Sequence, residues 1–356
     1  MKTVFHLITT INRGGAENQL LVLVREQVKS GIDVHVLYLK GEPELESEFK
    51  NVGAKVHHEL STKSFFLQPF AFRKIVLRHK PIVHAHLPRA ELVALLTPCN
   101  FKLFVSRHNA EPFFPGSPKY ISNFLSQLIE LRSVKVIAIS KAVKRFLLER
   151  GEIRNTNNIE VVLYGYQRHF LSSKESNSMT KASFRIGTIS RLAEQKDIPT
   201  MLAAFNKFLS NHPGSTLAIL GAGPLESELK KLVVRLHLEN SVTFDGRSPK
   251  VYEFLAELDM FILTSTYEGF GMVLLEAIDA GVPIIVSSNS AIPEVLGENF
   301  AGLCETGNSD DFAEKLEKCR GAEFRKLILD QQESRLQIFN SESMSRKICE
   351  IYSYKF

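Results

Sequence analysis

The sequence predicts an α/β protein with two doubly wound domains, each built around a parallel sheet. Along most of the chain, short apolar and β-branched segments alternate with segments that have the apolar period of a helix. A strongly polar stretch over residues 171–183 interrupts this alternation, which then restarts. At 356 residues, the chain is too long for one typical hydrophobic core and fits two.

In the first half, an apolar run over residues 3–9 predicts a strand, and a turn with Gly14 and Gly15 follows it. Residues 16–29 carry apolar side chains at the helical period, and Gly31 is expected to end this helix. Further strands, each followed by a helical stretch, are predicted at residues 33–39, 82–86, 103–107 and 134–139. This rhythm implies a parallel sheet with helices on both faces.

In the second half, strands are predicted at residues 184–189, 216–220, 242–244, 260–263 and 283–286. Helical segments at about 309–336 and 341–354 close the chain. The predicted organisation is a first domain over 1–170, a linker over 171–183 and a second domain over 184–336. Two such domains place a cleft between the carboxyl ends of their sheets, where ligands of doubly wound folds bind.

The composition is that of an ordinary globular protein, with 44 % hydrophobic and 23 % charged residues. The four cysteines, Cys99, Cys304, Cys319 and Cys349, are far apart in sequence, which excludes a disulfide scaffold and a cysteine zinc site and fits a reducing compartment. The first residues lack the apolar stretch of a signal peptide, and no run approaches the ~18 apolar residues of a membrane span. A cytoplasmic protein is expected.

The net charge of +5 hides an asymmetry between the two halves. Residues 1–170 hold 24 Lys and Arg against 14 Asp and Glu, a net charge of +10, and the remainder of the chain carries −5. The first half is therefore expected to face something anionic, such as a nucleic acid, a membrane surface or a phosphorylated acceptor.

Two glutamates, Glu268 and Glu276, flank a Gly-rich turn in the segment Glu268-Gly269-Phe270-Gly271-Met272 and its continuation. The strand predicted at 260–263 leads through this loop into a helix that opens near Gly271. Backbone N–H groups at such a helix start favour an anion, and carboxylates suit sugar hydroxyls. The alternative is a pair of surface glutamates beside a turn.

Two cations, Arg191 and Lys196, follow the strand predicted at 184–189. At the carboxyl end of that strand they could neutralise a pyrophosphate, Arg as a bidentate group and Lys as a point charge. The alternative is a solvated loop with ordinary charges.

Two further glycine loops give weaker signals. Gly221-Ala222-Gly223-Pro224 resembles a dinucleotide loop, but Glu226 stands at the third glycine position, so a plain turn with Pro224 in the first helical position is favoured. The turn Asn12-Arg13-Gly14-Gly15 is not a P-loop, because no Gly-Lys-Ser/Thr follows. Its two glycines allow a phosphate or acceptor to approach, or form only a tight turn.

Three histidines stand at predicted strand ends: His84, His86 and His108. A metal site is disfavoured, because no second ligand lies at helical i, i+3 or i+4 spacing. A hydrogen-bonding role is preferred for His108 and a structural one for His84.

In this order and spacing, the motifs resemble the retaining glycosyltransferases of family 4, which have the GT-B fold of two Rossmann-like domains facing a central cleft. The resemblance extends over nearly the whole chain. It rests on Gly14-Gly15-Ala16-Glu17, His84-Ala85-His86, His108, Ala138-Ile139-Ser140, Arg191 with Lys196, Gly221-Ala222-Gly223-Pro224, and Glu268 with Glu276.

The resemblance implies a UDP- or GDP-linked sugar donor in the second domain and a glycan or lipid-linked acceptor in the first. Catalytic roles are implied for Arg191, Lys196, Glu268 and His108. Further donor contacts are implied for Gly14, Gly15, Phe244, Phe270, Gly271 and Glu276. Arg13 and His86 are expected on the acceptor side, and the C-terminal helix over about 337–356 is expected to pack back on the first domain. No metal or other cofactor is expected.

Three positions depart from the family pattern. Ser190 and Asp197 stand where the family usually has Gly, and Asp279 stands where it often has Ala. None of them removes a charged group assigned to the donor, so activity is expected. They are expected to alter the shape of the loop at the donor phosphate.

The alternatives differ in class. A nucleotide-sugar epimerase of the same fold would convert sugars without an acceptor, and a sugar-nucleotide binder would do no chemistry. A phosphorylase would need a pyridoxal-bearing lysine and a much longer chain. A dinucleotide oxidoreductase is disfavoured by the missing third glycine, and a nucleic-acid-binding protein by the absence of a recognisable motif.

Aromatic and basic residues gather before the strand predicted at 82–86: Phe65, Phe66, Phe70, Phe72, Arg73, Lys74, Arg78 and Lys80. Such a stretch could lie on an anionic membrane at the inner face of the cell and serve a lipid-linked acceptor of cell-envelope polysaccharide synthesis. The favoured alternative is a core helix with a basic edge in water, in which Ile75 and Leu77 face the core. Residues 61–68 are the better candidates for a membrane contact.

Overall fold

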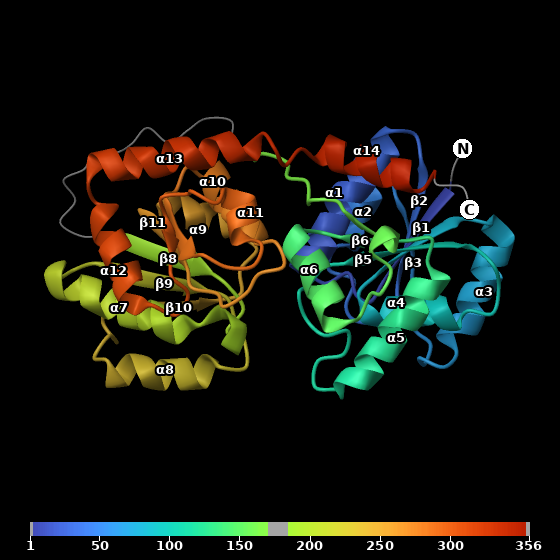
Figure 1. The fold of residues 1–356 in the computed structure, drawn as a ribbon, viewed down its shortest axis with the longest axis horizontal. Coiled ribbons are helices and arrows are strands. Elements are labelled where there is room, and N and C mark those ends of the chain that lie inside the picture. Colours follow the sequence, from blue (N-terminus) through green and yellow to red (C-terminus); the bar gives the residue numbers. More distant parts are fainter. Residues whose placement is uncertain (1–2, 170–183, 354–356) are drawn as a thin grey trace. The chain divides into compact units, whose positions relative to one another are not determined.

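The computed structural model describes residues 3–169 and 184–353 (Figure 1). The linker predicted at 171–183 lies outside the described residues. The chain forms two compact units, Met1–Gln167 with Phe339–Phe356, and Arg168–Ile338. We call them the N-terminal and the C-terminal unit.

The N-terminal unit contains a seven-stranded parallel sheet in the order β3-β2-β1-β4-β5-β6-β7. Its strands are β1 (Thr3–Ile8), β2 (Asp33–Tyr38), β3 (Lys55–His57), β4 (Ile82–His86), β5 (Lys102–Arg107), β6 (Lys135–Ala138) and β7 (Ile159–Val161). The strand order reverses between β1 and β4. In doubly wound folds, ligands bind outside the carboxyl ends of the strands at this point.

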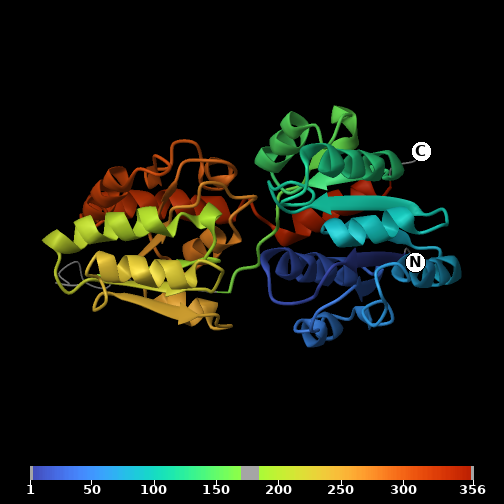
Figure 2. The same cartoon turned by 90° about the horizontal axis from the view of Figure 1, so that it is seen from below.

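The helices of this unit cover both faces of the sheet (Figure 2). They are α1 (Gly15–Lys29), α2 (Glu46–Asn51), α3 (Gln68–His79), α4 (Pro88–Leu96), α5 (Lys119–Arg132), α6 (Lys141–Arg150) and α14 (Ser341–Ile351). Because side chains alternate along a strand, Phe5 and Leu7 of β1 belong to one core cluster with α3, α4 and α5, and Val4 and Ile8 to clusters on the other face.

The last helix, α14, belongs to the N-terminal core. Met344, Ile348 and Ile351 are buried in one cluster with Val4 and Leu23. The chain returns to this unit beside its exit, since the backbone N–H of Tyr166 donates to the carbonyl of Phe339 at 2.7 Å.

The C-terminal unit has a six-stranded parallel sheet in the order β10-β9-β8-β11-β12-β13, so it repeats the same winding. Its strands are β8 (Arg185–Ile189), β9 (Thr216–Leu220), β10 (Val242–Gly246), β11 (Met260–Leu263), β12 (Ile284–Ser287) and β13 (Leu303–Cys304). Its helices are α7 (Ile198–Asn211), α8 (Glu226–Arg235), α9 (Val251–Glu257), α10 (Met272–Asp279), α11 (Ile292–Leu296), α12 (Ser309–Lys318) and α13 (Ala322–Leu336).

Some details of the sequence prediction were wrong. The helix predicted over 309–336 is two helices, because Gly321 has an extended conformation before α13. Pro224 is not the first residue of a helix, since α8 begins at Glu226. Leu77 does not face the core; its exposed fraction is 50 %, because it lies on the outer side of α3.

Candidate functional site

In the C-terminal unit, two loops lie at the carboxyl ends of the neighbouring strands β8 and β11, where the strand order reverses. One carries Arg191 and Lys196, and the other carries Glu268 and Gly271. The hydroxyl of Thr264 donates to the carbonyls of Lys196 and Asp197 at 3.0 and 2.9 Å, which fixes one loop to the other.

Lys196 and Glu268, 72 residues apart in sequence, meet across these loops. The Nζ atom of Lys196 lies 2.5 Å from Oε1 of Glu268, and both side chains are mostly buried. The same carboxylate oxygen accepts a hydrogen bond of 2.7 Å from Ser265. The two residues that we predicted as separate donor contacts therefore form one ion pair, while the nearby Arg191 is exposed to solvent.

The loop of Arg191 is supported by the glycines of the Gly221-Ala222-Gly223 segment. A Cβ atom at Gly221 would lie 1.9 Å from the carbonyl oxygen of Ser190, and one at Gly223 would lie 2.2 Å from that of Leu192. The backbone N–H of Leu192 donates to the carbonyl of Ala222, and that of Leu225 to the carbonyl of Leu192. These glycines therefore serve close backbone packing, as the plain-turn interpretation expects.

Asp197, one of the departures from the family pattern, has a left-handed backbone with φ = 45°. Glycine adopts this conformation without strain, and Asp tolerates it better than most residues. Its carboxylate accepts hydrogen bonds from the backbone N–H and the hydroxyl of Thr200 and so caps α7. The cap offsets part of the strain.

The other two departures are buried. The Oγ atom of Ser190 lies inside the protein with no hydrogen-bond partner among the described residues. Asp279 accepts from the guanidinium of Arg168 at 3.2 Å and from the backbone N–H of His169 at 2.6 Å. It therefore anchors the start of this unit to α10.

The helix α10 begins directly after Gly271, whose φ of 85° ends the loop in a left-handed turn. Phe270 before it is buried. One turn into α10, Glu276 is half-buried, and burial raises the pKa of its carboxyl group to about 7. Phe244 lies apart from these residues on the edge strand β10, where Lys230 stands 5.7 Å above its ring.

In the N-terminal unit, the loop after β1 leads into α1 through Gly14 and Gly15. A Cβ atom at Gly14 would lie 2.5 Å from the Glu17 carboxylate, whereas one at Gly15 would meet no atom of the described residues within 4 Å. Glu17 accepts a hydrogen bond of 2.7 Å from Thr10. Arg13 is held on the surface by an ion pair with Glu48.

The predicted histidines lie inside the N-terminal unit. His86 is 2 % exposed, and its two ring nitrogens lie 3.0 and 3.1 Å from those of His6 and His108. A direct contact of His86 with an acceptor does not fit this position. His108 is 9 % exposed, and its second nitrogen is hydrogen-bonded to the hydroxyl of Tyr164. Burial lowers the pKa of His108 to about 3, so the ring is neutral at pH 7.

One nitrogen each of His6, His84 and His86 lies within 4.8 Å of the others, an arrangement compatible with a metal ion. Each ring already has hydrogen-bond partners at both nitrogens: His6 with Gln27, His84 with Tyr352 and Ser106, and His86 with two histidines. A metal ion here would have to replace several of these hydrogen bonds. We therefore keep the prediction that the site holds none.

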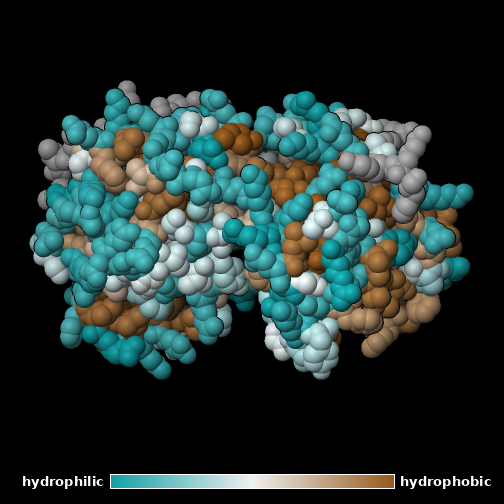
Figure 3. Space-filling view, in the orientation of Figure 1, coloured by the Kyte–Doolittle hydropathy of each residue, from teal (hydrophilic) through white to brown (hydrophobic). Residues whose placement is uncertain are grey.

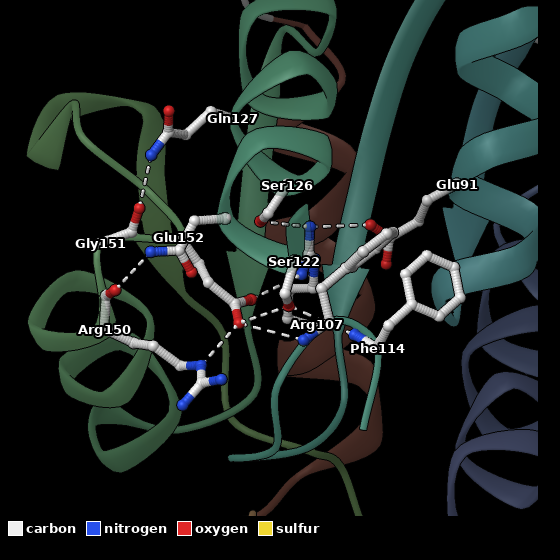
Figure 4. A network of polar contacts seen from close by, with 11 residues as sticks. Glu91, Arg107, Phe114, Ser122, Ser126, Gln127, Arg150, Gly151 and Glu152 are labelled. Atoms are coloured by element: carbon white, nitrogen blue, oxygen red, sulfur yellow. Dashed lines mark hydrogen bonds and ion pairs between the residues drawn. The ribbon is translucent and has the colours of Figure 1, made fainter. Parts of the chain in front are cut away.

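Arg107, beside His108, points to the opposite face of the sheet, because side chains alternate along a strand. Figure 4 shows the polar contacts of Arg107. Its guanidinium lies 2.9 Å from Glu91 of α4 and 3.5 Å from Glu152, which follows α6. Glu152 in turn accepts from the backbone N–H of Phe113 at 3.0 Å. This buried network, with Ser122 and Ser126 of α5, holds the loop that follows His108.

No role was predicted for His6, Tyr164 or Ser265, which contact the predicted site residues His86, His108 and Glu268, or for Gln27, which contacts His6. The polar Gln27 falls on the apolar stripe of α1, beside Leu23 and Val24, and it is fully buried. A polar side chain at a core position is a usable signal. Its partners cannot be read from a pattern.

Comparison with known proteins assigns the family. The family model described as "Glycosyltransferase Family 4" matches residues 13–166, and the model described as "Glycosyl transferases group 1" matches residues 170–321. The protein is a family 4 glycosyltransferase. Two solved structures share the GT-B fold of this glycosyltransferase over 99 % of its chain. HepE of Anabaena, in complex with UDP and glucose, has a TM-score of 0.84 at 19 % identity over 100 % of its own chain. TarM of S. aureus has a TM-score of 0.82 at 14 % identity over 99 % of its own chain.

Curated relatives include the N-acetyl-alpha-D-glucosaminyl L-malate synthase of Bacillus anthracis, 29 % identical over 60 % of this glycosyltransferase and 57 % of that protein. The putative glycosyltransferase EpsF of Bacillus subtilis is 24 % identical over 81 % of this chain and 79 % of its own. The capsular polysaccharide biosynthesis glycosyltransferase CapM of Staphylococcus aureus is 22 % identical over 88 % of this chain and 87 % of its own.

Proposed function

We propose that this glycosyltransferase transfers a sugar from a nucleotide-diphosphate sugar to a hydroxyl group of a glycan acceptor, with retention of configuration. The observation that carries the proposal is the pair of cross-linked loops at the carboxyl ends of β8 and β11. They combine an exposed Arg191 with the Lys196–Glu268 ion pair, and Glu276 stands nearby on α10.

Arg191 and Lys196 supply positive charge for the leaving nucleoside diphosphate. In this proposal the diphosphate competes with Glu268 for Lys196, which frees the carboxylate to accept hydrogen bonds from hydroxyls of the transferred sugar. Glu276 accepts from the ribose hydroxyls. A preorganised donor of this kind is typically worth about 2.7–4 kcal/mol of barrier when removed.

Retention follows in the proposal from attack on the same face of the sugar as the leaving group. The bond from the acceptor oxygen to the anomeric carbon forms as the bond to the phosphate oxygen breaks. The acceptor proton passes to that phosphate oxygen, so the protein supplies no nucleophile. The anomeric configuration of the product, measured by NMR, tests this step, and an inverted product contradicts it.

The relatives guide the choice of substrates. HepE of Anabaena was solved with UDP and with UDP-glucose, and CapM takes part in capsular polysaccharide synthesis. We therefore propose a UDP-linked donor and a role in polysaccharide synthesis. Preferential turnover of a GDP-sugar would contradict the choice of base.

The deciding experiment incubates the protein with a panel of nucleotide sugars and measures nucleoside diphosphate release and thermal shift. Arg191→Ala and Glu268→Ala are expected to lose about 100-fold or more of the turnover. The exposed Lys231 on α8 provides the control Lys231→Ala, which should retain it. Near wild-type turnover of both site variants would overturn the assignment. Conversion of the sugar without an acceptor would instead indicate an epimerase.

We further propose that no metal ion takes part, because two protein cations already supply the charge at the donor phosphates. Dialysis against EDTA is expected to leave the rate of UDP release unchanged. A loss of activity that Mg²⁺ or Mn²⁺ restores would contradict this.

We also propose that the N-terminal unit contacts an anionic membrane surface through α3, α4 and α5. Large apolar side chains are exposed on or beside these neighbouring helices: Phe66, Leu67, Phe70, Leu77, Leu96, Tyr120, Ile121, Phe124 and Leu131. Figure 3 shows such side chains gathered over this part of the unit. Exposed Lys74, Arg78 and Lys119 accompany them, and α3 contains no acidic residue. Among the described residues, no helix is long and apolar enough to span a bilayer.

Co-sedimentation with vesicles tests this contact. Binding to vesicles that contain phosphatidylglycerol is expected at low salt, and it should weaken in Phe66→Ser/Phe70→Ser. Val234→Ser, at an exposed position of α8 in the other unit, is the control. Equal binding to zwitterionic vesicles, or no binding at low salt, would refute an anionic surface as the partner.

A further inference from the structure

A continuous chain of hydrogen bonds crosses the interior of the N-terminal unit from α1 to the residue that follows β7 by three positions. Oε1 of Gln27 lies 2.7 Å from Nε2 of His6, and Nδ1 of His6 lies 3.0 Å from Nε2 of His86. Nδ1 of His86 lies 3.1 Å from Nε2 of His108, and Nδ1 of His108 contacts the hydroxyl of Tyr164. All five side chains are buried.

We propose that Gln27 fixes the tautomers of His6, His86 and His108 through this chain and so acts as a positioning residue for His108 and Tyr164. A neutral imidazole has one N–H donor and one acceptor nitrogen, so the partner at one nitrogen decides the role of the other. An amide oxygen only accepts. The atom that Gln27 presents therefore determines which nitrogen of His6 carries the proton. Each ring in turn determines which nitrogen of the next ring is protonated.

The direction of the chain follows step by step. His6 must donate from Nε2 to the oxygen of Gln27, which leaves its Nδ1 as an acceptor. His86 must then donate from Nε2 to His6, and His108 from Nε2 to His86. Nδ1 of His108 is left as an acceptor, so the hydroxyl of Tyr164 donates to it. All three histidines carry their proton on Nε2.

The amide nitrogen of Gln27 starts a second chain that is consistent with the first. It donates to the hydroxyl of Tyr352 at 3.4 Å, and that hydroxyl lies 2.7 Å from Nδ1 of His84. Nε2 of His84 then donates to Ser106 at 2.8 Å. The oxygen of the Gln27 amide thus belongs to the first chain and its nitrogen to the second. This arrangement keeps the oxygen directed toward His6.

The rings are neutral, as this chain requires. Burial lowers the pKa of His6 to about 4, against the smaller opposite effect of its hydrogen bond to Gln27. Burial, with neighbouring histidines as a smaller cause, also lowers the pKa of His84 and His86 well below the ordinary value. Burial and the charge of Glu17 raise the pKa of Tyr164, so its phenol keeps its proton.

The consequence concerns the candidate site. Both nitrogens of His108 are engaged and the only proton of Tyr164 is committed to His108, so the Tyr164 oxygen can only accept further hydrogen bonds. We infer that His108 acts by fixing this buried oxygen as an acceptor toward the O–H or N–H groups around it, which holds the His108 side of the candidate site in one arrangement. This last step rests on the proposed function, whereas the tautomer assignment does not.

The test uses the full-length protein with ¹⁵N-labelled histidine. Long-range ¹⁵N–¹H correlation spectra distinguish a protonated ring nitrogen from an unprotonated one. We expect Nε2–H signals for His6, His86 and His108 in the wild-type protein, assigned with single His→Gln variants. An Nδ1–H signal for His108 would overturn the proposal, whether or not the protein transfers sugar.

Two variants test whether Gln27 sets the direction of donation along the hydrogen-bond chain. Gln27→Met, which removes the acceptor at one end, is expected to give mixed tautomers at His6, His86 and His108. Tyr164→Phe, at the other end, should leave all three as Nε2–H. The opposite pattern would overturn the proposal. Gln332→Met, which removes a buried glutamine of the C-terminal unit, controls for general destabilisation and should leave the histidine spectra unchanged.

Kinetics test the link to the reaction. Gln27→Met is expected to lower kcat for sugar transfer roughly tenfold, a change of about 1.4 kcal/mol, and to leave the Kd of the sugar nucleotide unchanged. A changed tautomer with unchanged kcat would refute the positioning role and keep the tautomer assignment. If no nucleotide sugar is turned over even by the wild-type protein, the proposed function fails while the spectra still decide the chain.

Discussion

Single glycines control the shape of the candidate donor loop more directly than the charged residues do. Gly221 has φ = 147°, and the space where its Cβ would lie is occupied by the carbonyl of Ser190. Any side chain there must push away the loop that carries Arg191. The position of the Arg191 charge therefore depends on Gly221, which is itself uncharged.

We therefore predict that Gly221→Ala lowers the free energy of unfolding by about 1–3 kcal/mol and weakens binding of the sugar nucleotide. Calorimetry and thermal shift measure the two effects. Gly307→Ala is the matched control, because Gly307 also has a positive φ of 78° but open space around it. If the control weakens donor binding equally, displacement of the loop is not the cause.

The carboxyl group of Glu276 titrates in the physiological range, because burial raises its pKa to about 7. Below pH 7 it is mostly protonated, and above pH 7 it is the carboxylate that accepts charge-assisted hydrogen bonds from hydroxyls. We predict that affinity for the sugar nucleotide rises roughly threefold to tenfold from pH 6 to pH 8 and that Glu276→Gln removes this dependence.

Titration calorimetry at several pH values measures this effect. The intact sugar nucleotide must be used, because the terminal phosphate of a free nucleoside diphosphate titrates in the same range. Glu298→Gln, at an exposed position of the same unit, should keep the pH dependence of the wild type. A flat profile in the wild-type protein would exclude Glu276 from the donor contact.

Residue types and their positions at strand ends could be predicted, but their pairings could not. The sequence indicated Lys196 and Glu268 as site residues, because each follows an apolar strand in a Gly-containing or charged loop. It could not indicate that they bind each other, since the contact depends on β8 and β11 being neighbours in the sheet. For the same reason, the contact between His6 and Gln27 could not be predicted, because these residues meet only when α1 packs on β1.

Among the secondary-structure elements, the end of β5 supports two networks on opposite faces of the sheet. Arg107 joins Glu91 and Glu152 on one face, and His108 joins the histidine chain on the other. Strand alternation places neighbouring residues in these separate environments. A disturbance on one face can therefore displace the residue on the other.

We predict that Arg107→Met costs about 3–5 kcal/mol of stability, because it leaves the buried carboxyl group of Glu91 without its cation, whereas Glu152 keeps its ion pair with Arg150. The double variant Arg107→Met/Glu91→Met should recover part of this loss, since it also removes that unpaired carboxyl group. Denaturant unfolding measures both. Arg145→Met, on the exposed side of α6, should change stability by less than about 0.5 kcal/mol. A small effect of Arg107→Met would mean that the network contributes little.

The elements themselves were largely predictable, because long strands and helices have local patterns. The predicted strands at 82–86, 216–220 and 260–263 agree with β4, β9 and β11 to the residue. The short strands β3, β7 and β13 escaped the prediction. They have two or three residues each, which is too few to show the alternation of apolar and polar residues typical of a strand. They form only because they can hydrogen-bond to a neighbouring strand.

For the chain as a whole, the sequence predicted two doubly wound domains and the family. The structure confirms the two doubly wound domains, and the family models confirm the family. The charge excess of the first half agrees with its exposed basic helices, whereas Arg191 and Lys196, the cations proposed to bind the donor diphosphate, belong to the acidic half. Net charge therefore does not locate the donor.

The assignment of α14 to the N-terminal unit gives a prediction for unfolding. Ile348→Ala is expected to destabilise that unit by about 2–4 kcal/mol, because it opens a cavity in the cluster with Val4 and Leu23. Hydrogen exchange resolved by peptide should show faster exchange in β1 and α1 and unchanged exchange in β8 and β11. Ile328→Ala in α13 should give the reverse pattern. Faster exchange in both units with either variant would contradict independent cores.

This use of α14 has a consequence for biosynthesis. Gln27 and Tyr352, which meet in the N-terminal interior, are separated by 325 residues. The ribosome therefore delivers the first sheet long before the helix that covers part of it, and the C-terminal unit can fold in the interval. The N-terminal core is therefore the first to begin folding and the last to be completed. Until α14 is synthesised, the apolar face with Val4, Leu23 and Phe104 needs to be covered by another molecule, such as a chaperone.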